Sequence, residues 1–248
     1  MSNNYIEAIT TNKKLVLRIC LGAVILLVLI VATKQILYPI FDSQFVVVEG
    51  KTFEYRGQSW SKFEIAKFEV TQELWESVMA KNHSTFKGSK RPANDFNWYL
   101  AVEFCNKLSE KEGLQRVYSG RGKEITCDFT ANGYRLPTEE EWEYAASGGN
   151  KSKGYVYSGS NNLEEVGWYS CSGTEEVGKK KPNELGLYDM SGNAPEWCWD
   201  MGDYSFSRVL RGGGWDTSEE YCRVSRSRNV GASHTNNGRR GLRLVRTR

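Results

Sequence analysis

The longest apolar stretch of the chain lies close to its N-terminus. Residues 15–32 read LVLRICLGAVILLVLIVA, and Arg18 is the only charged residue among them. About twenty predominantly apolar residues are needed for a helix to cross the hydrocarbon core of a bilayer. We therefore expect a transmembrane anchor over residues 15–34. A cleaved signal peptide shares the basic start and the apolar stretch, and it is the alternative interpretation.

Basic residues are more frequent before this stretch than after it. Lys13 and Lys14 precede it, and Lys34 follows it. Positively charged flanks stay preferentially in the cytoplasm. We therefore expect a single-pass membrane protein, in which residues 1–14 form a cytoplasmic tail and the domain over residues 45–248 is extracytoplasmic.

Hydrophobic periodicity predicts a strand and then a helix early in this domain. Residues 63–70, FEIAKFEV, alternate between apolar and polar positions as a half-buried strand does. Thr71 is a suitable N-cap for a helix that follows directly. This predicted helix carries its apolar residues on one face: Leu74, Trp75, Val78 and Met79.

Two further helices are predicted from their caps and spacing. From Asn97 to Gly113, apolar residues recur at helical spacing, and a glycine is a common helix terminator. Cys105 lies on this apolar stripe, so we expect it in the core. Thr138 and Glu141 form a capping box, which predicts that a third helix begins there and ends before the next pair of glycines.

Beyond Gly149 neither period persists. The chain becomes rich in Gly, Asn, Ser and aromatic residues, so we expect little regular structure there. Irregular chain cannot satisfy its buried backbone groups by ladders alone, and side-chain hydrogen bonds, buried aromatic rings or bound cations must contribute. We expect the tryptophans of the second half to form the core: Trp142, Trp168, Trp197, Trp199 and Trp215.

Length and charge restrict the class of protein. A chain of 248 residues with 40% hydrophobic residues supports one substantial core and leaves little room for a second domain. Four of the 33 Lys and Arg residues and two of the 30 Asp and Glu residues lie within residues 1–44, so the remainder carries 29 basic and 28 acidic residues. A nearly neutral domain without a basic block argues against nucleic acid as a partner.

Cysteine and histidine counts exclude several kinds of site. Five of the six cysteines lie outside the apolar stretch, at irregular spacing and without a CxxC pair, which describes neither a disulfide framework nor a zinc site. One or two disulfide bridges remain open in an oxidising compartment. His83 and His234 are the only histidines, so a multi-histidine iron or zinc centre cannot be assembled.

Six phrases in series resemble the formylglycine-generating-enzyme, or sulfatase-modifying factor, superfamily. They are FEVTQELWESVM, AVEFCNKLSEKEGL, GYRLPTEEEWEYAA, KKPNELGLYDMSGNAPEW, RVLRGGGW and GRRGLRLVR, in the family's order within residues 45–248. The resemblance implies a turn-rich α+β fold related to the C-type lectin fold. The family includes copper oxidases, iron-dependent enzymes and non-catalytic domains, so the resemblance leaves the activity open.

One departure from the family pattern concerns copper. The copper enzymes of the family carry two cysteines five residues apart after a Gly-Gly-Ser-aromatic phrase. Here Cys222 matches the second cysteine, whereas Thr217 stands in place of the first and Gly214 in place of the serine. Because a hydroxyl is a poor ligand for soft Cu(I), we expect copper chemistry to be absent. Cys198 could supply a substitute sulfur if the fold brought it close to Cys222.

A second part of the resemblance concerns calcium. The matching residues of a family calcium loop are Asp189, Gly192, Ala194 and Glu196, and the resemblance implies two carboxylates and two backbone carbonyls as ligands. Such oxygen ligands suit Ca²⁺. The alternative is a plain turn in which the two carboxylates bond to backbone amides or to Arg243.

Three functions follow from these features. The first is a membrane-tethered recognition or scaffold module without copper oxidase activity, for which polar residues between Asp216 and Gly238 form either a surface for an exported protein or surface ligand, or simply a solvated loop. The second is a formylglycine-generating-type oxidase that modifies exported proteins, with Cys222 as its catalytic thiol. The third is an accessory subunit of an envelope complex.

Overall fold

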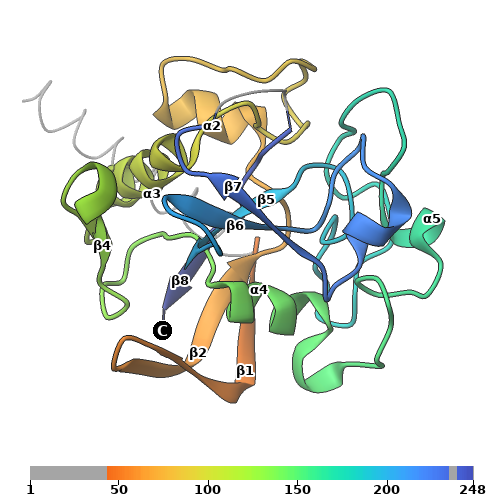
Figure 1. Cartoon of the computed structure of the whole chain (residues 1–248), viewed down its shortest axis with the longest axis horizontal. Helices are drawn as coiled ribbons and strands as arrows, with labels where there is room; N and C mark the ends of the chain where they lie inside the picture. Colours follow the sequence, from red (N-terminus) through yellow and green to blue (C-terminus); the bar gives the residue numbers. More distant parts are fainter. Residues whose placement is uncertain (1–43, 235–238, 248) are drawn as a thin grey trace, which may run out of the picture. The chain divides into compact units, whose positions relative to one another are not determined.

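The computed structural model describes residues 44–234 and 239–247 (Figure 1). The predicted tail over residues 1–14 and the anchor over residues 15–34 lie outside these ranges. Within the described ranges, no helix combines the length and the apolar character that a membrane crossing requires.

The first sheet joins the start of the domain to its end. Its strands are β1 (Phe45–Tyr55), β2 (Gln58–Ala66) and β8 (Val245–Thr247), in the order β1-β2-β8 with antiparallel pairing. The predicted strand over residues 63–70 therefore overlaps β2, but β2 ends at Ala66, four residues before the predicted end. The amide of Val70 instead donates to the carbonyl of Leu242, at 2.9 Å, because the chain has left the sheet by then.

The three main helices begin as their caps predict. They are α2 (Gln72–Val78), α3 (Trp98–Glu112) and α4 (Glu139–Ala146). The side chains of Thr71 and Asn97 accept the amides of Leu74 and Leu100, and Gly113 ends α3 in the left-handed region, at φ 75°. The stripe of α3 is buried, and Cys105 is fully buried in it.

The capping box of α4 is also present. Thr138 Oγ1 accepts the amide of Glu141 at 3.1 Å, and Glu141 Oε2 accepts the amide of Thr138 at 2.8 Å. The Glu141 carboxylate also receives two hydrogen bonds of 2.7 Å from Arg135 and one from Trp60 Nε1. This buried cluster fixes α4 against β2, which contributes Trp60.

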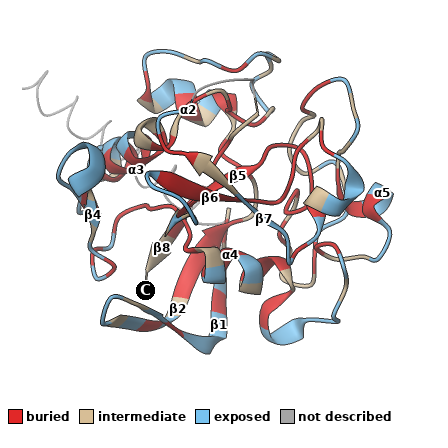
Figure 2. Cartoon of the chain, viewed as in Figure 1, coloured by how far each residue is buried: buried red, intermediate tan, exposed pale blue. Residues whose placement is uncertain are grey.

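A second sheet lies in the half of the chain for which little regular structure was predicted. It consists of β5 (Glu196–Met201), β6 (Ser207–Arg211) and β7 (Ser227–Gly231), in the order β5-β6-β7. All five residues of β6 are buried (Figure 2), including Arg208, whose guanidinium lies 3.8 Å from the centre of the Trp98 ring. The prediction was wrong here because buried arginines remove the alternation that marks a strand.

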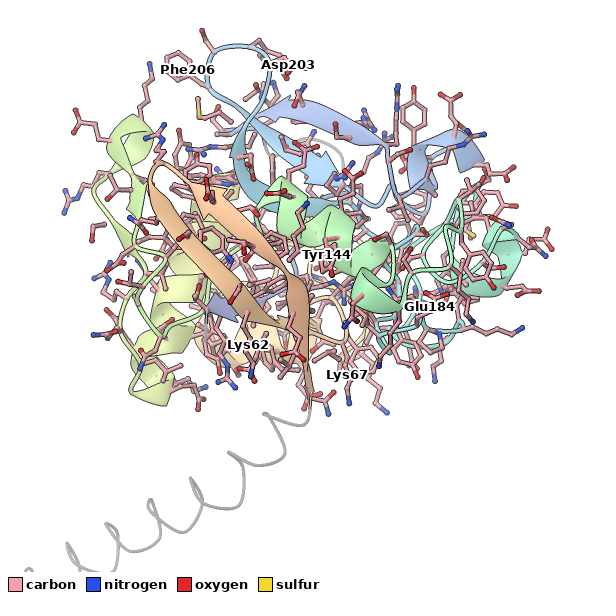
Figure 3. All side chains as sticks on the ribbon, turned by 90° about the horizontal axis from the view of Figure 1, so that it is seen from below. Lys62, Lys67, Tyr144, Glu184, Asp203 and Phe206 are labelled. Carbon is pink, nitrogen blue, oxygen red and sulfur yellow. The ribbon has the colours of Figure 1, made fainter. Side chains whose placement is uncertain are left out.

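The hairpin between β5 and β6 projects from the rest of the domain. Asp203 and Phe206 lie at its tip (Figure 3). The Phe206 ring is about half exposed, and the Lys123 ammonium lies 3.3 Å from its centre. The remaining short elements are β3 (Tyr118–Ser119), β4 (Thr126–Cys127), α5 (Leu163–Val166) and the 3₁₀ turns η1 (Gly122–Glu124), η2 (Gly149–Lys151) and η3 (Glu219–Cys222).

Side-chain hydrogen bonds hold the irregular segment between α4 and β5. Asn183 Nδ2 donates to the carbonyl of Ala145 at 2.8 Å, and Asn183 Oδ1 accepts the amides of Leu185 and Leu187. Of the five tryptophans expected in the core, Trp142, Trp197 and Trp199 are buried, while Trp168 and Trp215 are partly exposed. The core prediction therefore holds for three of them.

The described cysteines are all free thiols. The one or two disulfide bridges that the sequence left open are thus not formed among Cys105, Cys127, Cys171, Cys198 and Cys222.

Candidate functional site

The turn after β6 carries the two residues that correspond to the family's copper ligands. Gly212 and Gly213 adopt φ values of 90° and 70°, which glycine alone reaches without strain. A Cβ atom on Gly213 would lie 2.8 Å from the sulfur of Cys222. The glycines therefore let the backbone pass close to η3, which holds Cys222.

Thr217 and Cys222 lie side by side in this turn. The distance from Thr217 Oγ1 to Cys222 Sγ is 3.7 Å, and both residues are buried. Thr217 Oγ1 also accepts the amide of Gly214 at 3.0 Å and donates to the carbonyl of Gly214 at 2.9 Å. The hydroxyl is thus hydrogen-bonded within its own turn, which explains why a buried threonine is stable at this position.

The Cys222 thiol lies in an apolar cluster. Its buried neighbours are Tyr157, Leu163 and Val166, with Tyr169 partly buried beside them. Burial raises the pKa of this thiol to about 11. Because the thiolate is the form that binds metals and attacks substrates, these surroundings disfavour both roles.

The donor set therefore does not fit Cu(I). One buried thiol and one hydroxyl supply a single sulfur, whereas a soft monovalent ion favours a pair. Burial also raises the pKa of Cys198 well above its usual range, and the charged groups that act on it are those of Asp200, Arg211, Glu139 and Glu196. Glu219 is the charged group that acts on Cys222, so the two thiols lie in different surroundings.

The candidate calcium residues belong to the turn that enters β5. Glu196 is buried, and its carboxylate accepts Trp142 Nε1 at 2.7 Å. Arg243 pairs with the same carboxylate, with Nη2 at 2.7 Å and Nε at 3.0 Å from Oε1. This is the ion pair that the plain-turn alternative predicts.

Asp189 is held differently. Its Oδ2 atom accepts the amide of Gly178 at 2.6 Å, while its buried Oδ1 atom has no hydrogen-bond partner among the described residues. Burial raises the pKa of Asp189 to about 6. An unpartnered oxygen in a buried carboxylate needs a proton or a cation, so this atom fits one ligand position of a calcium site.

A third buried carboxylate, which the sequence reasoning missed, lies beside these two. Glu69 accepts the amide of Ala194 at 2.9 Å and Asn193 Nδ2 at 2.7 Å. Burial raises the pKa of Glu69 well above its usual range, and the charges of Asp189 and Glu196 raise it further. Glu196 therefore pairs with Arg243, and two further buried carboxylates, of Glu69 and Asp189, lie within range of the arginine's charge.

The four predicted calcium residues lie within eight positions of one another, and the His, Cys, Asp and Glu side chains of the described residues form no group of three that could hold a metal ion. Gly192 adopts φ 95°, and a Cβ atom there would lie 2.3 Å from the carbonyl oxygen of Trp168. The backbone amide of Ala194 donates a hydrogen bond to the Glu69 carboxylate, which fixes the position of Ala194. No local pattern pointed to Glu69, because 124 residues separate it from Asn193.

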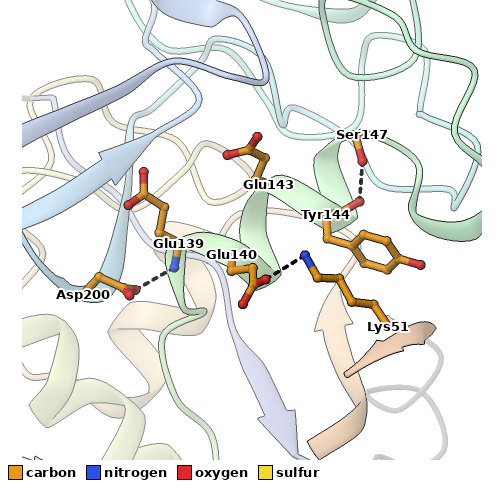
Figure 4. A pocket seen from close by; sticks show the side chains of 7 residues that line it. All are labelled: Lys51, Glu139, Glu140, Glu143, Tyr144, Ser147 and Asp200. Carbon is orange, nitrogen blue, oxygen red and sulfur yellow. Dashed lines mark hydrogen bonds and ion pairs between the residues drawn. The ribbon is translucent and has the colours of Figure 1, made fainter. Parts of the chain in front are cut away.

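The surface of the described residues includes a larger and a smaller cavity. The larger, of about 460 Å³, lies along α4 (Figure 4) and is lined by Lys51, Glu139, Glu140, Glu143, Tyr144, Ser147 and Asp200. Glu140 pairs with Lys51 at 2.6 Å, and Asp200 Oδ2 accepts the amide of Glu139 at 2.6 Å. Glu140 and Asp200 thus already have partners within the protein, as is usual for acidic residues on a solvated helix face.

The smaller cavity, of about 150 Å³, borders Thr217. Three arginines line it together with apolar side chains, and sequence reasoning did not single them out: Arg228, Arg239 and Arg240.

Comparisons with known proteins agree with this architecture. A family model described as the sulfatase-modifying factor enzyme 1-like domain matches residues 42–248. The chain is 39% identical over 251 residues to the chaperone protein LppX of Paenibacillus barcinonensis, covering 82% of this chain and 89% of that protein. It is 30% identical over 192 residues to the formylglycine-generating enzyme of Streptomyces coelicolor, covering 60% of each.

A solved structure with the same fold is that of Treponema denticola variable protein 1. It superposes with a TM-score of 0.72 at 34% identity, covering 82% of this chain and 95% of that one. The mixed helix and strand architecture, the turn after β6 and the match over residues 42–248 lead to one conclusion. The chain belongs to the sulfatase-modifying factor, or formylglycine-generating-enzyme-like, family.

Proposed function

We propose that this domain is a recognition or scaffold module, which binds an exported protein or a surface ligand and lacks copper oxidase activity. The observation that carries the proposal is the pairing of Thr217 with Cys222 at 3.7 Å. A hydroxyl that is already bonded within its own turn replaces the sulfur that a copper enzyme of this family uses.

The state of the remaining thiol supports the same proposal. With a pKa of about 11, the Cys222 thiol is ionised in roughly one molecule in ten thousand at pH 7. An oxidase would need this group as a thiolate, and the apolar cluster around it contains no cation that would favour the charged form.

One of the relatives supports binding rather than chemistry. The relative that is 39% identical is named a chaperone, and binding of a polypeptide without modifying it is what that name describes.

The proposed location is outside the cytoplasm, tethered by residues 15–34. Alkaline carbonate extraction of membranes and protease digestion of intact cells test this location: extraction of the full chain would contradict the tether.

Calcium binding at the turn that enters β5 is part of the proposal. The unpartnered Oδ1 atom of Asp189 and the excess of buried carboxylates over Arg243 support it. The carboxylate of Glu196 and the carbonyls of Gly192 and Ala194 would complete the ligand set. Calcium would then stabilise the turn rather than take part in a reaction.

A direct experiment separates this function from the oxidase alternative. The purified chain is loaded with Cu(I) and incubated in air with a Cys-x-Pro-x-Arg peptide, and mass spectrometry detects formylglycine. We expect no product from the wild-type chain. Formylglycine that appears with the wild type and disappears with Cys222→Ser would overturn the proposal and establish the oxidase.

A further inference from the structure

The smaller cavity gathers positive charge beside the turn that holds Thr217. Arg228 belongs to β7, whereas Arg239 and Arg240 lie in the segment that leads to β8. The three arginines therefore come from two parts of the chain and line one cavity of about 150 Å³. An engineered cavity of similar volume holds a benzene molecule, so the space suits one side chain or a small acid.

Among the described residues, Arg239 is the one of these three arginines that forms an ion pair. Arg239 Nε lies 2.6 Å from Asp216 Oδ2. Arg228 lies over the Tyr221 ring, at 5.3 Å from its centre, and forms no ion pair with a described residue. The cavity thus carries more positive charge than its own residues neutralise.

Arg240 is the most enclosed member of the group. Its guanidinium lies 5.7 Å from the centre of the Trp197 ring, and its Nη1 donates to the carbonyl of His234 at 3.1 Å. Burial lowers the pKa of Arg240, and the charges of Arg228 and Arg239 lower it further than Tyr204 and Asp95 raise it. An anion in the cavity would relieve this repulsion and accept the remaining N–H donors.

The other walls of the cavity are apolar. Pro195, Leu210 and Val230 line it together with the arginines. An inorganic anion gains nothing from such walls, whereas the methylene groups of an acidic side chain gain free energy by leaving water beside them. The combination fits a carboxylate at the end of a short apolar stem.

We propose that this arginine cavity binds the carboxylate side chain of an acidic polypeptide segment. The guanidinium groups of Arg228 and Arg240 contact the carboxylate oxygens, and Pro195, Leu210 and Val230 contact the stem. The inference rests on the proposed recognition function, for which it names the class of ligand.

Fluorescence anisotropy with a labelled Gly-Glu-Gly-Glu-Gly-Glu peptide tests this inference on the whole chain. A Gly-Gln-Gly-Gln-Gly-Gln peptide is the uncharged control. We expect the glutamate peptide to bind at least tenfold more tightly than the glutamine peptide. Arg240→Gln should weaken glutamate-peptide binding about tenfold, since a hydrogen bond to a charged group contributes about 1.5–3 kcal/mol.

Arg228→Gln and Arg226→Gln form a matched pair of variants. Both residues are exposed and both lie over the Tyr221 ring, but only Arg228 lines the cavity. We expect Arg228→Gln to weaken binding several-fold and Arg226→Gln to change it less than twofold. Equal losses would overturn the inference, because they would reflect net charge alone. Heparin fragments that bind more tightly than the peptide in the same cavity would also overturn it, in favour of a sulfated polysaccharide.

The outcomes of this test are separate from those of the oxidase test. Formylglycine production together with arginine-dependent peptide binding would overturn the proposed function and leave the cavity's ligand class standing. Absence of both would overturn the ligand class and leave the non-catalytic assignment intact.

Discussion

Replacing Glu196 with glutamine tests the buried ion pair that joins β5 to the C-terminal segment. Arg243 is fully buried and donates to Glu196 as well as to the carbonyls of Ala66 and Tyr188, at 2.9 and 2.8 Å. Glu196→Gln keeps the shape of the side chain and one acceptor oxygen but removes the charge. Arg243 would then remain buried without its carboxylate.

The expected cost follows from burial. Removing one partner of a buried ion pair costs about 3–5 kcal/mol, because the other charge is left uncompensated. The two carbonyl acceptors stay on Arg243, and Asp189 and Glu69 can take over part of its charge. We therefore expect a loss near the lower limit, about 3 kcal/mol in the free energy of unfolding.

Urea denaturation at pH 7 with EDTA measures this loss. The matched control is Glu165→Gln, which removes a carboxylate from the exposed pair with Lys181, at 3.3 Å. Exposed pairs contribute about 0–1 kcal/mol, so the control should change little. If Glu196→Gln cost less than 1 kcal/mol with an unchanged denaturant slope, the structural role of the buried pair would be refuted.

Three further predictions concern pH, helix capping and calcium. Burial raises the pKa of Asp200 to about 6 from 3.8, so the folded state binds the proton more tightly. Stability should therefore fall as pH rises from about 4 to 6, and Asp200→Asn should reduce that slope in a urea-unfolding series against pH, while Asp189 maintains the remainder. Thr138→Ala should lower the free energy of unfolding by about 1 kcal/mol through loss of the N-cap, and an effect within error would contradict the cap's role. Calcium at a hundred times its dissociation constant should stabilise the wild-type chain by about 2.7 kcal/mol in thermal or urea unfolding, and Glu196→Gln should abolish the gain. An unchanged wild-type midpoint would exclude the site.

The helices were predictable because their signals are local. Thr71, Asn97 and Thr138 bond to backbone amides three residues further on, and Gly113 ends α3 within the same short window. Such caps depend on a few neighbouring residues and are therefore readable from the sequence.

The second sheet was not predictable because its residues depend on distant partners. Arg211 in β6 is buried, pairs with Glu143 of α4 and lies 5.2 Å from the centre of the Trp142 ring. A charged residue is expected to be exposed when only the sequence is known, because its distant partners are not visible there. Its burial hides the strand from any alternation rule.

The candidate site was likewise predictable only where its residues are close in sequence. The family resemblance placed Thr217 and Cys222 in corresponding positions, and five residues of spacing are enough to expect them near each other. Glu69 lies more than a hundred residues from the turn that it contacts, so the excess of buried carboxylate there became visible only in the structure.

Copper content tests the central claim most directly. The reduced wild-type chain and Thr217→Cys are loaded anaerobically with Cu(I), dialysed against a competing chelator, and analysed for copper per chain. We predict that the wild type retains no stoichiometric copper. Thr217→Cys, which places a second sulfur where Thr217 Oγ1 now lies 3.7 Å from Cys222 Sγ, should retain more. One tightly held copper ion per wild-type chain would contradict the account.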